Sequence, residues 1–303
     1  MNRRLLVVLL LGFLAAPLAA EVKTVVLVAG KPSHPPRMHE FNAGVLLMAK
    51  CLRGVPDLQV QTVLNGWPKE ESIFENADAV VFFMDGGGRH EVVQEKGRRL
   101  KMVDQWADRG VGLGFMHYGV EVVADQAGEH MKRWIGGHYE HMFSCNPLWE
   151  PDFAVLPDHE ITRGVSPFKA NDEWYFNMRF IGDSAGNEPT SLGEMRFVPI
   201  LVAKPSPEVR DGPYVYPKGP YQHIQASKGR AEAMMWAVER KDGGRGFGFT
   251  GGHYHDNWAN EEYRKVVLNA ILWISKVDVP TKGVESSVTQ QELDDNLDPK
   301  GNR

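Results

Sequence analysis

The chain has 303 residues, of which 43% are hydrophobic and 24% are charged. This composition is typical of a folded protein with a packed core and excludes an intrinsically disordered chain. The formal net charge is −5 at pH 7, and the chain contains no run of five Lys or Arg residues. We therefore expect no nucleic-acid partner, because such partners are bound through basic surfaces.

The first twenty residues have the pattern of a secretory signal peptide. Arg3 and Arg4 precede an apolar stretch, residues 5–18, which is followed by Ala19 and Ala20. As a helix this stretch would span about 21 Å, which is short of the roughly 30 Å core of a bilayer and disfavours a retained anchor. We predict cleavage after Ala20, export to the periplasm or the extracellular space, and no stable membrane insertion after cleavage.

The chain has only two cysteines, Cys51 and Cys145. An oxidising compartment would permit a bridge between them, but two cysteines are too few to form the scaffold of a chain of this length. We interpret them as two buried thiols.

The first half of the mature chain alternates short β-branched runs with helical patterns. This alternation is typical of a parallel sheet that is covered by helices on both faces, and it predicts a doubly wound α/β fold. The expected strands are residues 22–29, 58–64, 78–84 and 111–116, and the expected helices are residues 41–52 and 92–107.

The second half is less regular. The expected strands are residues 153–155, 197–203, 233–239 and 246–250, and a last helix is expected at residues 260–275 with Asn260 as its N-cap. Residues 204–231 contain five prolines, which predicts a surface insertion without regular elements. We expect one domain over residues 21–280 and a polar tail over residues 281–303, with one short helix after Thr289 and little order beyond it.

Six of the eleven histidines directly follow strand-like runs. In an open α/β sheet, ligands bind in the crevice beyond the carboxyl ends of the strands, so several of these imidazoles are expected to share one cleft. Any one of them, taken alone, is better explained as a loop histidine bonded to backbone or water. The six are His34, His39, His90, His117, His253 and His255.

His117 lies in the sequence G-F-M-H-Y-G, which predicts a strand, a tight turn and the start of a helix. This geometry is similar to a nucleophile elbow, with an imidazole at its tip that can act as acid, base or metal ligand. The triplet Gly86 to Gly88 follows the preceding strand and could present backbone N–H groups to an oxyanion or a sugar hydroxyl. Either segment could instead be a purely structural turn.

Two further segments combine acidic, aromatic and imidazole side chains. In Asp172-Glu173-Trp174-Tyr175, a carboxylate against aromatic rings can have a raised pKa, and the rings suit sugar faces; a half-buried edge strand is the alternative. In the segment 251–258, His253 and His255 are expected to share one face of an extended chain and to bind one metal ion, with His34 or His117 completing the site.

We also expect His138 and His141 to be adjacent on a helix, either in a cleft wall or at the surface.

Taken together, these motifs resemble the ThuA-like (trehalose utilisation) family. The resemblance rests on the G-F-M-H-Y-G turn, the D-E-W-Y segment and the ending G-R-G-F-G-F-T-G-G-H-Y-H-D-N-W, and it covers nearly all of residues 22–280. It implies a flavodoxin-like fold of the class I glutamine-amidotransferase-like superfamily, and a link to trehalose and related sugars, including keto-sugars. The matching positions are His117, Glu173 and His253. True amidotransferases have a cysteine at the elbow, where this chain has His117.

The main hypothesis is an exported sugar-processing enzyme, a hydrolase, lyase or isomerase, whose partner is a small carbohydrate. The alternatives are a sugar-binding protein without turnover and, more remotely, a cysteine-dependent amidase. We expect acid–base roles for His117, Glu173 and His253, with a divalent metal such as zinc as a candidate cofactor; its candidate ligands are His34, His117, His253 and His255. The expected substrate-binding residues are His34, Gly86, Gly87, Tyr118, Asp172, Trp174, Tyr175, His255 and Trp258.

Overall fold

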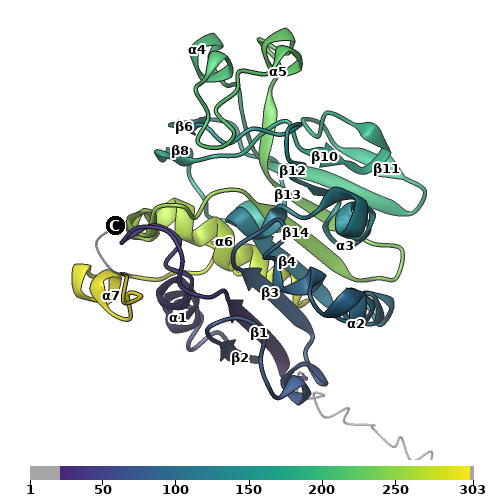
Figure 1. Ribbon diagram of the computed structural model, residues 1–303. Coiled ribbons are helices and arrows are strands. Elements are labelled where there is room, and N and C mark those ends of the chain that lie inside the picture. The colour runs from purple at the N-terminus through teal and green to yellow at the C-terminus, as the bar shows by residue number, and fades with distance from the viewer. Residues whose placement is uncertain (1–20, 301–303) are drawn as a thin grey trace, which may run out of the picture.

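An eight-stranded sheet runs through residues 21–300, the part of the chain that the computed structural model describes (Figure 1). The predicted signal peptide, residues 1–20, lies outside the described residues. The strands of the sheet are β1 (Lys23–Ala29), β2 (Leu58–Val63), β3 (Ala79–Phe83), β4 (Gly112–Met116), β11 (Thr190–Leu192), β12 (Met195–Ala203), β13 (Glu232–Glu239) and β14 (Arg245–Phe249).

Their order across the sheet is β11-β12-β13-β14-β4-β3-β1-β2. The strands β2, β1, β3, β4 and β14 are parallel, and their chain order corresponds to the 2-1-3-4-5 order of flavodoxin-like folds. The strands β13, β12 and β11 extend this sheet in antiparallel fashion. The structure therefore confirms the predicted doubly wound, mostly parallel α/β fold, and it adds an antiparallel extension.

Helices cover both faces of the sheet, as predicted. The helices are α1 (Phe41–Cys51), α2 (Arg98–Asp108), α3 (Glu129–Ile135) and α6 (Glu261–Ile274). Side chains of one strand alternate between the two faces. Val25 and Leu27 belong to the core beneath α1 and α6, whereas Val26 and Val28 belong to the core beneath α2 and α3. The predicted N-cap of the last helix is confirmed, because the side chain of Asn260 accepts hydrogen bonds from the first turn of α6.

Two helical predictions need correction. The helix that was expected from residue 92 begins only at Arg98, because Glu95 and Lys96 adopt left-handed backbone angles with φ of 56° and 52°. His138 and His141 are not on a helix: α3 ends at Ile135, Gly136 follows it with a φ of 85°, and His138 lies on a strand.

The connections of the second half form three short strand pairs. The predicted strand at residues 153–155 is only two residues long and ends at Phe153. The pairs are β5 (Gly137–His138) with β10 (Arg179–Phe180), β6 (Leu148–Trp149) with β9 (Asp172–Glu173), and β7 (Asp152–Phe153) with β8 (Phe168–Lys169).

Residues 204–231 contain two short helices, α4 (Pro207–Asp211) and α5 (Gln222–Ala226), so the expectation of no regular element is wrong. Ser206 caps α4, and Pro207 suits its first position because it needs no donor there. Both helices project beyond the sheet at the top of Figure 1.

The tail contains the predicted short helix after Thr289, α7 (Gln290–Asp294), and Thr289 and Glu292 form a capping box at its start. The expectation of little order beyond it is wrong for residues 295–300, because Asp298 is buried and Lys300 makes an ion pair with Glu40. The tail therefore returns to the body of the protein beside α1.

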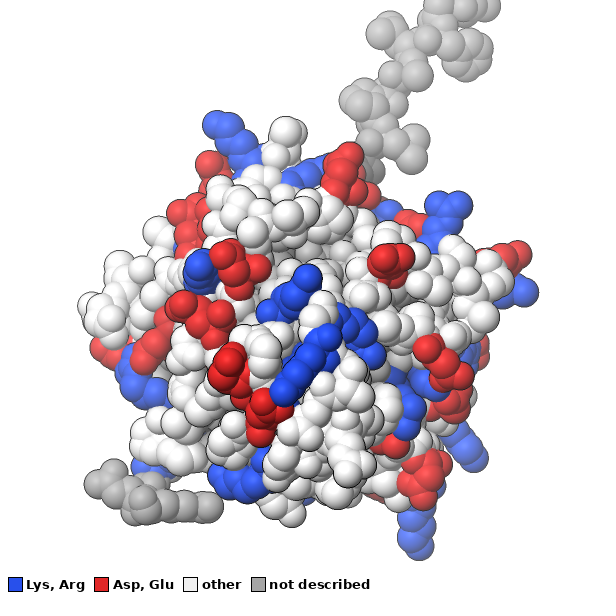
Figure 2. Space-filling view, turned by 90° about the horizontal axis from the view of Figure 1, so that it is seen from above, with Lys and Arg blue, Asp and Glu red and all other residues white. Residues whose placement is uncertain are grey.

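Three further features concern the cysteines, the length of the helices and the surface charge. Cys51 and Cys145 are buried free thiols, as interpreted from the sequence. Among the described residues, no helix has the length and apolar character needed to cross a membrane. On the face shown in Figure 2, acidic and basic side chains are intermixed and form no extended basic area.

The buried His90 leads to a prediction about pH. Its ring Nδ1 accepts the backbone N–H of Val92 and its Nε2 donates to the carbonyl of Gly119, which satisfies the neutral ring. Burial lowers the pKa of His90 to about 4, so the unfolded chain binds a proton at a pH where the native protein does not. We expect the free energy of unfolding to fall as the pH drops from about 6.5 to 4, by up to about 3 kcal/mol from this group.

The measurement is urea denaturation at pH 7 and at pH 4.5, for the wild type and for His90→Gln. The loss of stability at low pH should be smaller in the variant. An equal loss in both proteins would contradict the assignment of the effect to His90.

Candidate active site

Four parallel strands end level with one another and deliver the site residues to one edge of the sheet. Ala29 pairs with Phe83, Phe83 pairs with Met116, and Met116 pairs with Phe249. The loops that follow β1, β3, β4 and β14 therefore start side by side at the carboxyl edge. Those loops carry His34 and His39, Asp85 to Gly88, His117, and His253 respectively.

His117 occupies the turn that the sequence predicted, between β4 and a short 3-10 helix. Its φ of 50° is left-handed, which costs a non-glycine residue about 1–2 kcal/mol. The fully buried ring is held by the carbonyl of Thr250, 2.9 Å from Nδ1. A carbonyl only accepts, so Nδ1 carries the proton and Nε2 presents a lone pair to the site.

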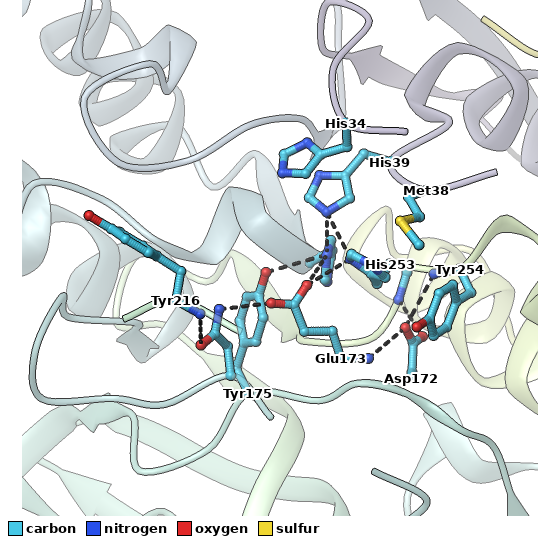
Figure 3. A network of polar contacts seen from close by, with 12 residues as sticks. His34, Met38, His39, Asp172, Glu173, Tyr175, Tyr216, His253 and Tyr254 are labelled. Carbon is cyan, nitrogen blue, oxygen red and sulfur yellow. Dashed lines mark hydrogen bonds and ion pairs between the residues drawn. The ribbon is translucent and has the colours of Figure 1, made fainter. Parts of the chain in front are cut away.

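His39 lies between the other two imidazoles. Its Nε2 is 3.0 Å from Nε2 of His117 and 3.0 Å from Nδ1 of His253 (Figure 3). On the far side of the ring, Nδ1 lies 3.5 Å from the carboxylate of Asp85, which also accepts a hydrogen bond from Ser33. A histidine that binds a metal through one ring nitrogen is commonly oriented by a carboxylate that accepts a hydrogen bond from the other.

Glu173 supplies the acidic group. Its Oε2 is 2.7 Å from Nδ1 of His253 and 3.7 Å from Nε2 of His117. Its other oxygen accepts a hydrogen bond of 2.7 Å from the amide of Asn146, and the hydroxyl of Tyr175 approaches His117 Nε2 at 3.3 Å. The side chain of Glu173 is 4% exposed, so its carboxylate is stabilised by Asn146 and His253 rather than by water.

We call His39, His117, Glu173 and His253 the histidine–glutamate cluster. Their ligand atoms all lie within 4.8 Å of one another, and all four residues are buried. Three imidazole nitrogens and one carboxylate oxygen are a donor set that suits Zn²⁺. The cluster therefore fits a divalent metal ion.

Burial also keeps the rings in the ligating form. The pKa values of His39 and His117 lie well below their usual range, first because of burial and second because each faces another histidine of the cluster. Burial raises the pKa of Glu173, and the contact with His253 opposes that shift. Two of the three imidazoles are thus neutral near pH 7, as metal binding requires.

The cluster forms part of the wall of a cavity of about 740 Å³. Tyr118, Tyr175 and Tyr216 add aromatic surface, and Glu121 adds a carboxyl group. Tyr216 comes from the 204–231 insertion, which therefore helps to shape the cavity. The volume and the mixed aromatic and polar walls are suitable for a small polar molecule.

The structure brings the three predicted catalytic residues, His117, Glu173 and His253, into contact. Of the predicted substrate-binding residues, four line the cavity: His34, Gly87, Tyr118 and Tyr175. Gly86 lies just behind it, where a Cβ atom would be 2.1 Å from the carbonyl of Tyr118, so this glycine is needed for close backbone packing.

His255 is not placed to ligate the same metal ion as His253. After His253 the chain turns into a 3-10 helix that begins at His255, so the two side chains do not share a face. Its backbone N–H bonds to the carbonyl of Arg37 instead. His34 stacks on His39 and is not a member of the cluster; it belongs to a second group of possible ligands, with His39 and Asp85.

Three further predicted contact residues have structural positions outside the cavity lining. Trp174 and Trp258 are 0% and 1% exposed and belong to the core beneath α6. Asp172 is buried and accepts hydrogen bonds from the hydroxyl of Tyr263 and the N–H of Gly252. It therefore anchors the loop that carries His253.

Sequence reasoning missed His39 as a ligand, and it missed Asp85, Glu121 and Asn146 altogether. The position of His39 after a predicted strand indicated that it could lie in the cleft. Because it is ten residues beyond the end of β1, the sequence did not show that its ring lies at the carboxyl edge of the sheet. Burial raises the pKa of Glu121 to about 8, with a further contribution from Glu173, although nothing in its sequence context indicates this.

The geometry defines an α/β protein of flavodoxin-like topology with an imidazole-rich pocket at the carboxyl edge of its sheet. The family model for ThuA, described as trehalose utilisation, matches residues 25–274, so the chain belongs to the ThuA family. This membership indicates a carbohydrate-related role. Comparison with curated proteins gave no match.

Two solved structures of proteins described as thua-like share the fold. One, from Bacteroides uniformis, has a TM-score of 0.56 and 11% identity over 87% of this chain and 95% of that chain. The other, from Parabacteroides merdae, has a TM-score of 0.51 and 14% identity over 89% of this chain and 94% of that chain.

The cluster predicts zinc binding. Wild-type protein that is purified without a polyhistidine tag and treated with a chelator should take up about one zinc ion per chain. Because His39→Ala removes one ligand, its dissociation constant for zinc should rise by about a hundredfold or more. The measurement is competition against a chromophoric chelator, with circular dichroism to confirm folding.

His130→Ala is the matched control. His130 lies on α3, where its ring contacts Asp104, and it is not part of the cluster. Its affinity for zinc should equal that of the wild type. Equal affinities of the wild type and His39→Ala would rule out the cluster as the metal site.

Proposed function

We propose that this protein is an exported enzyme that processes a sugar or keto-sugar glycoside by acid–base chemistry with the help of a divalent metal such as zinc. The observation that carries the proposal is the convergence of three imidazoles and one carboxylate beside a cavity of about 740 Å³, whose wall includes His39, Glu173 and His253. Membership of the ThuA family supports a carbohydrate as the substrate.

In this proposal His39, His117, Glu173 and His253 hold the metal ion, which would polarise a carbonyl or hydroxyl oxygen of the substrate. Residues that hold a metal are not free to transfer protons at the same time. The acid–base role expected for His117, Glu173 and His253 therefore passes to another group in the cavity wall.

Glu121 is the group best suited to that role. It lines the cavity, and a Cβ atom at Gly87 would lie 3.5 Å from its Oε1 and 3.8 Å from the hydroxyl of Tyr118. The absence of a side chain at Gly87 thus leaves room for a substrate beside this carboxyl group. Burial raises the pKa of Glu121, which favours its protonated form, and in that form it can donate a proton to a leaving oxygen.

The alternative of a cysteine-dependent amidase lacks a nucleophile at the described site. Cys51 and Cys145 are buried and do not line the cavity. Burial raises the pKa of both thiols, which disfavours the thiolate that such chemistry needs.

The test is a panel of disaccharides and their keto derivatives with product analysis. The zinc-loaded wild type should convert at least one of them. Glu121→Gln should lower kcat by about a hundredfold or more, because it removes the proton donor. Its affinity for the sugar should stay within about tenfold.

Glu129→Gln serves as the control, because Glu129 pairs with Lys132 on α3, away from the cavity lining. Its kcat should match the wild type. Sugar binding without turnover across the whole panel would favour a non-catalytic sugar-binding protein instead.

Export is the second part of the proposal and rests on Arg3, Arg4 and the apolar residues 5–18. Protein produced with its full N-terminal sequence in a bacterial host should be recovered from the periplasm with Glu21 as its first residue. N-terminal sequencing checks this. Soluble cytoplasmic protein that retains residues 1–20 would contradict export.

A further inference from the structure

The loop that carries His39 has an unfavourable backbone conformation. His34, Arg37 and His39 all have left-handed backbone angles, with φ of 61°, 66° and 49°. Non-glycine residues avoid this region, and such conformations persist only where the surrounding structure holds them. The loop therefore needs external contacts to keep the ring of His39 in place.

Lys300 provides the first of these contacts. Its ammonium group donates to the carbonyl of Met38 and, at 3.2 Å, to the carbonyl of His39. It also lies 3.1 Å from the carboxylate of Glu40. The side chains of Lys300 and Glu40 are 5% and 1% exposed, so solvent screens this pair little.

Glu40 joins the loop to the tail through both of its oxygens. One accepts the backbone N–H of Arg37 at 2.8 Å, and the other accepts the backbone N–H of Asp298 at 2.8 Å. Asp298 is held in turn by the amide of Asn42, at 2.7 Å, in the first turn of α1. Residues on both sides of His39 are thus bound to the end of the chain.

The same loop is linked to the loop of a second cluster residue. The N–H of His39 donates to the carbonyl of His253 at 3.0 Å, and Met38 forms a β-bridge with Tyr254. Any shift of the His39 loop would therefore also disturb the backbone beside His253.

We propose that residues 296–300 form a strap that positions His39 in the histidine–glutamate cluster, with Lys300 as the positioning residue. The strap acts on residues 37–40, and none of its residues is among the described residues that line the cavity. Its effect on the backbone is independent of any metal, whereas its effect on metal affinity rests on the proposed function.

The first test is hydrogen exchange in metal-free protein. Lys300→Met keeps an unbranched side chain of similar length but removes the ammonium group that donates to two carbonyls. A peptide that covers residues 33–42 should exchange about tenfold faster than in the wild type, while peptides from β4 and α6 remain unchanged. Lys300→Arg retains a cationic donor and should restore most of the protection.

Lys282→Met is the matched control, because Lys282 is exposed and its side chain has no ion pair or hydrogen bond within the described residues. It should leave exchange in residues 33–42 unchanged. Unchanged exchange in Lys300→Met would overturn the proposal.

The second test is zinc affinity by competition with a chelator. The dissociation constant of Lys300→Met should rise about tenfold over the wild type and return toward it in Lys300→Arg. Faster exchange with unchanged affinity would overturn the positioning role. Wild-type protein that takes up no zinc would refute the proposed metal site, and the exchange result would then decide by itself whether the strap holds the loop.

Discussion

The register of four parallel strands, which end at the same edge of the sheet, is the constraint on which the rest of this structure depends. The row from Ala29 through Phe83 and Met116 to Phe249 fixes where each following loop begins. Because backbone hydrogen bonds set this register, the positions of His117 and Thr250 relative to each other are decided by the sheet and not by the side chains. The hydrogen bond between them then orients the ring of His117.

Burial gives the cluster its chemical character. The titratable groups His39 and Glu173 are only 1% and 3% exposed, and each contacts His117 and His253. Desolvation disfavours each charged form, so the rings stay neutral, and a bound cation would compensate the negative charge of the carboxylate. The same environment that makes the cluster costly in free energy makes it suitable for holding a metal ion. Strain at His39 and His117 points the same way, since such strain is concentrated at functional sites.

Two segments from the second half of the chain complete the cavity. The short strand β9 delivers Glu173, and the insertion delivers Tyr216. Neither segment has a strong local pattern, because two-residue strands and proline-rich loops bury too little apolar surface to show periodicity. They are shaped by the body of the protein on which they pack, and this explains why the predicted elements were least accurate here.

The amino-acid sequence by itself determined the α/β class, the main strands and helices of the first half and the last helix, because these elements depend on local periodicity and capping. It also indicated His117, Glu173 and His253, since each follows or lies within a recognisable motif. Only the tertiary structure decided that His39 joins them, that His255 does not, and that Trp174 is core. These outcomes depend on where distant loops turn and which groups lose their water, and both are set by packing across the sheet edge rather than by neighbours in the chain.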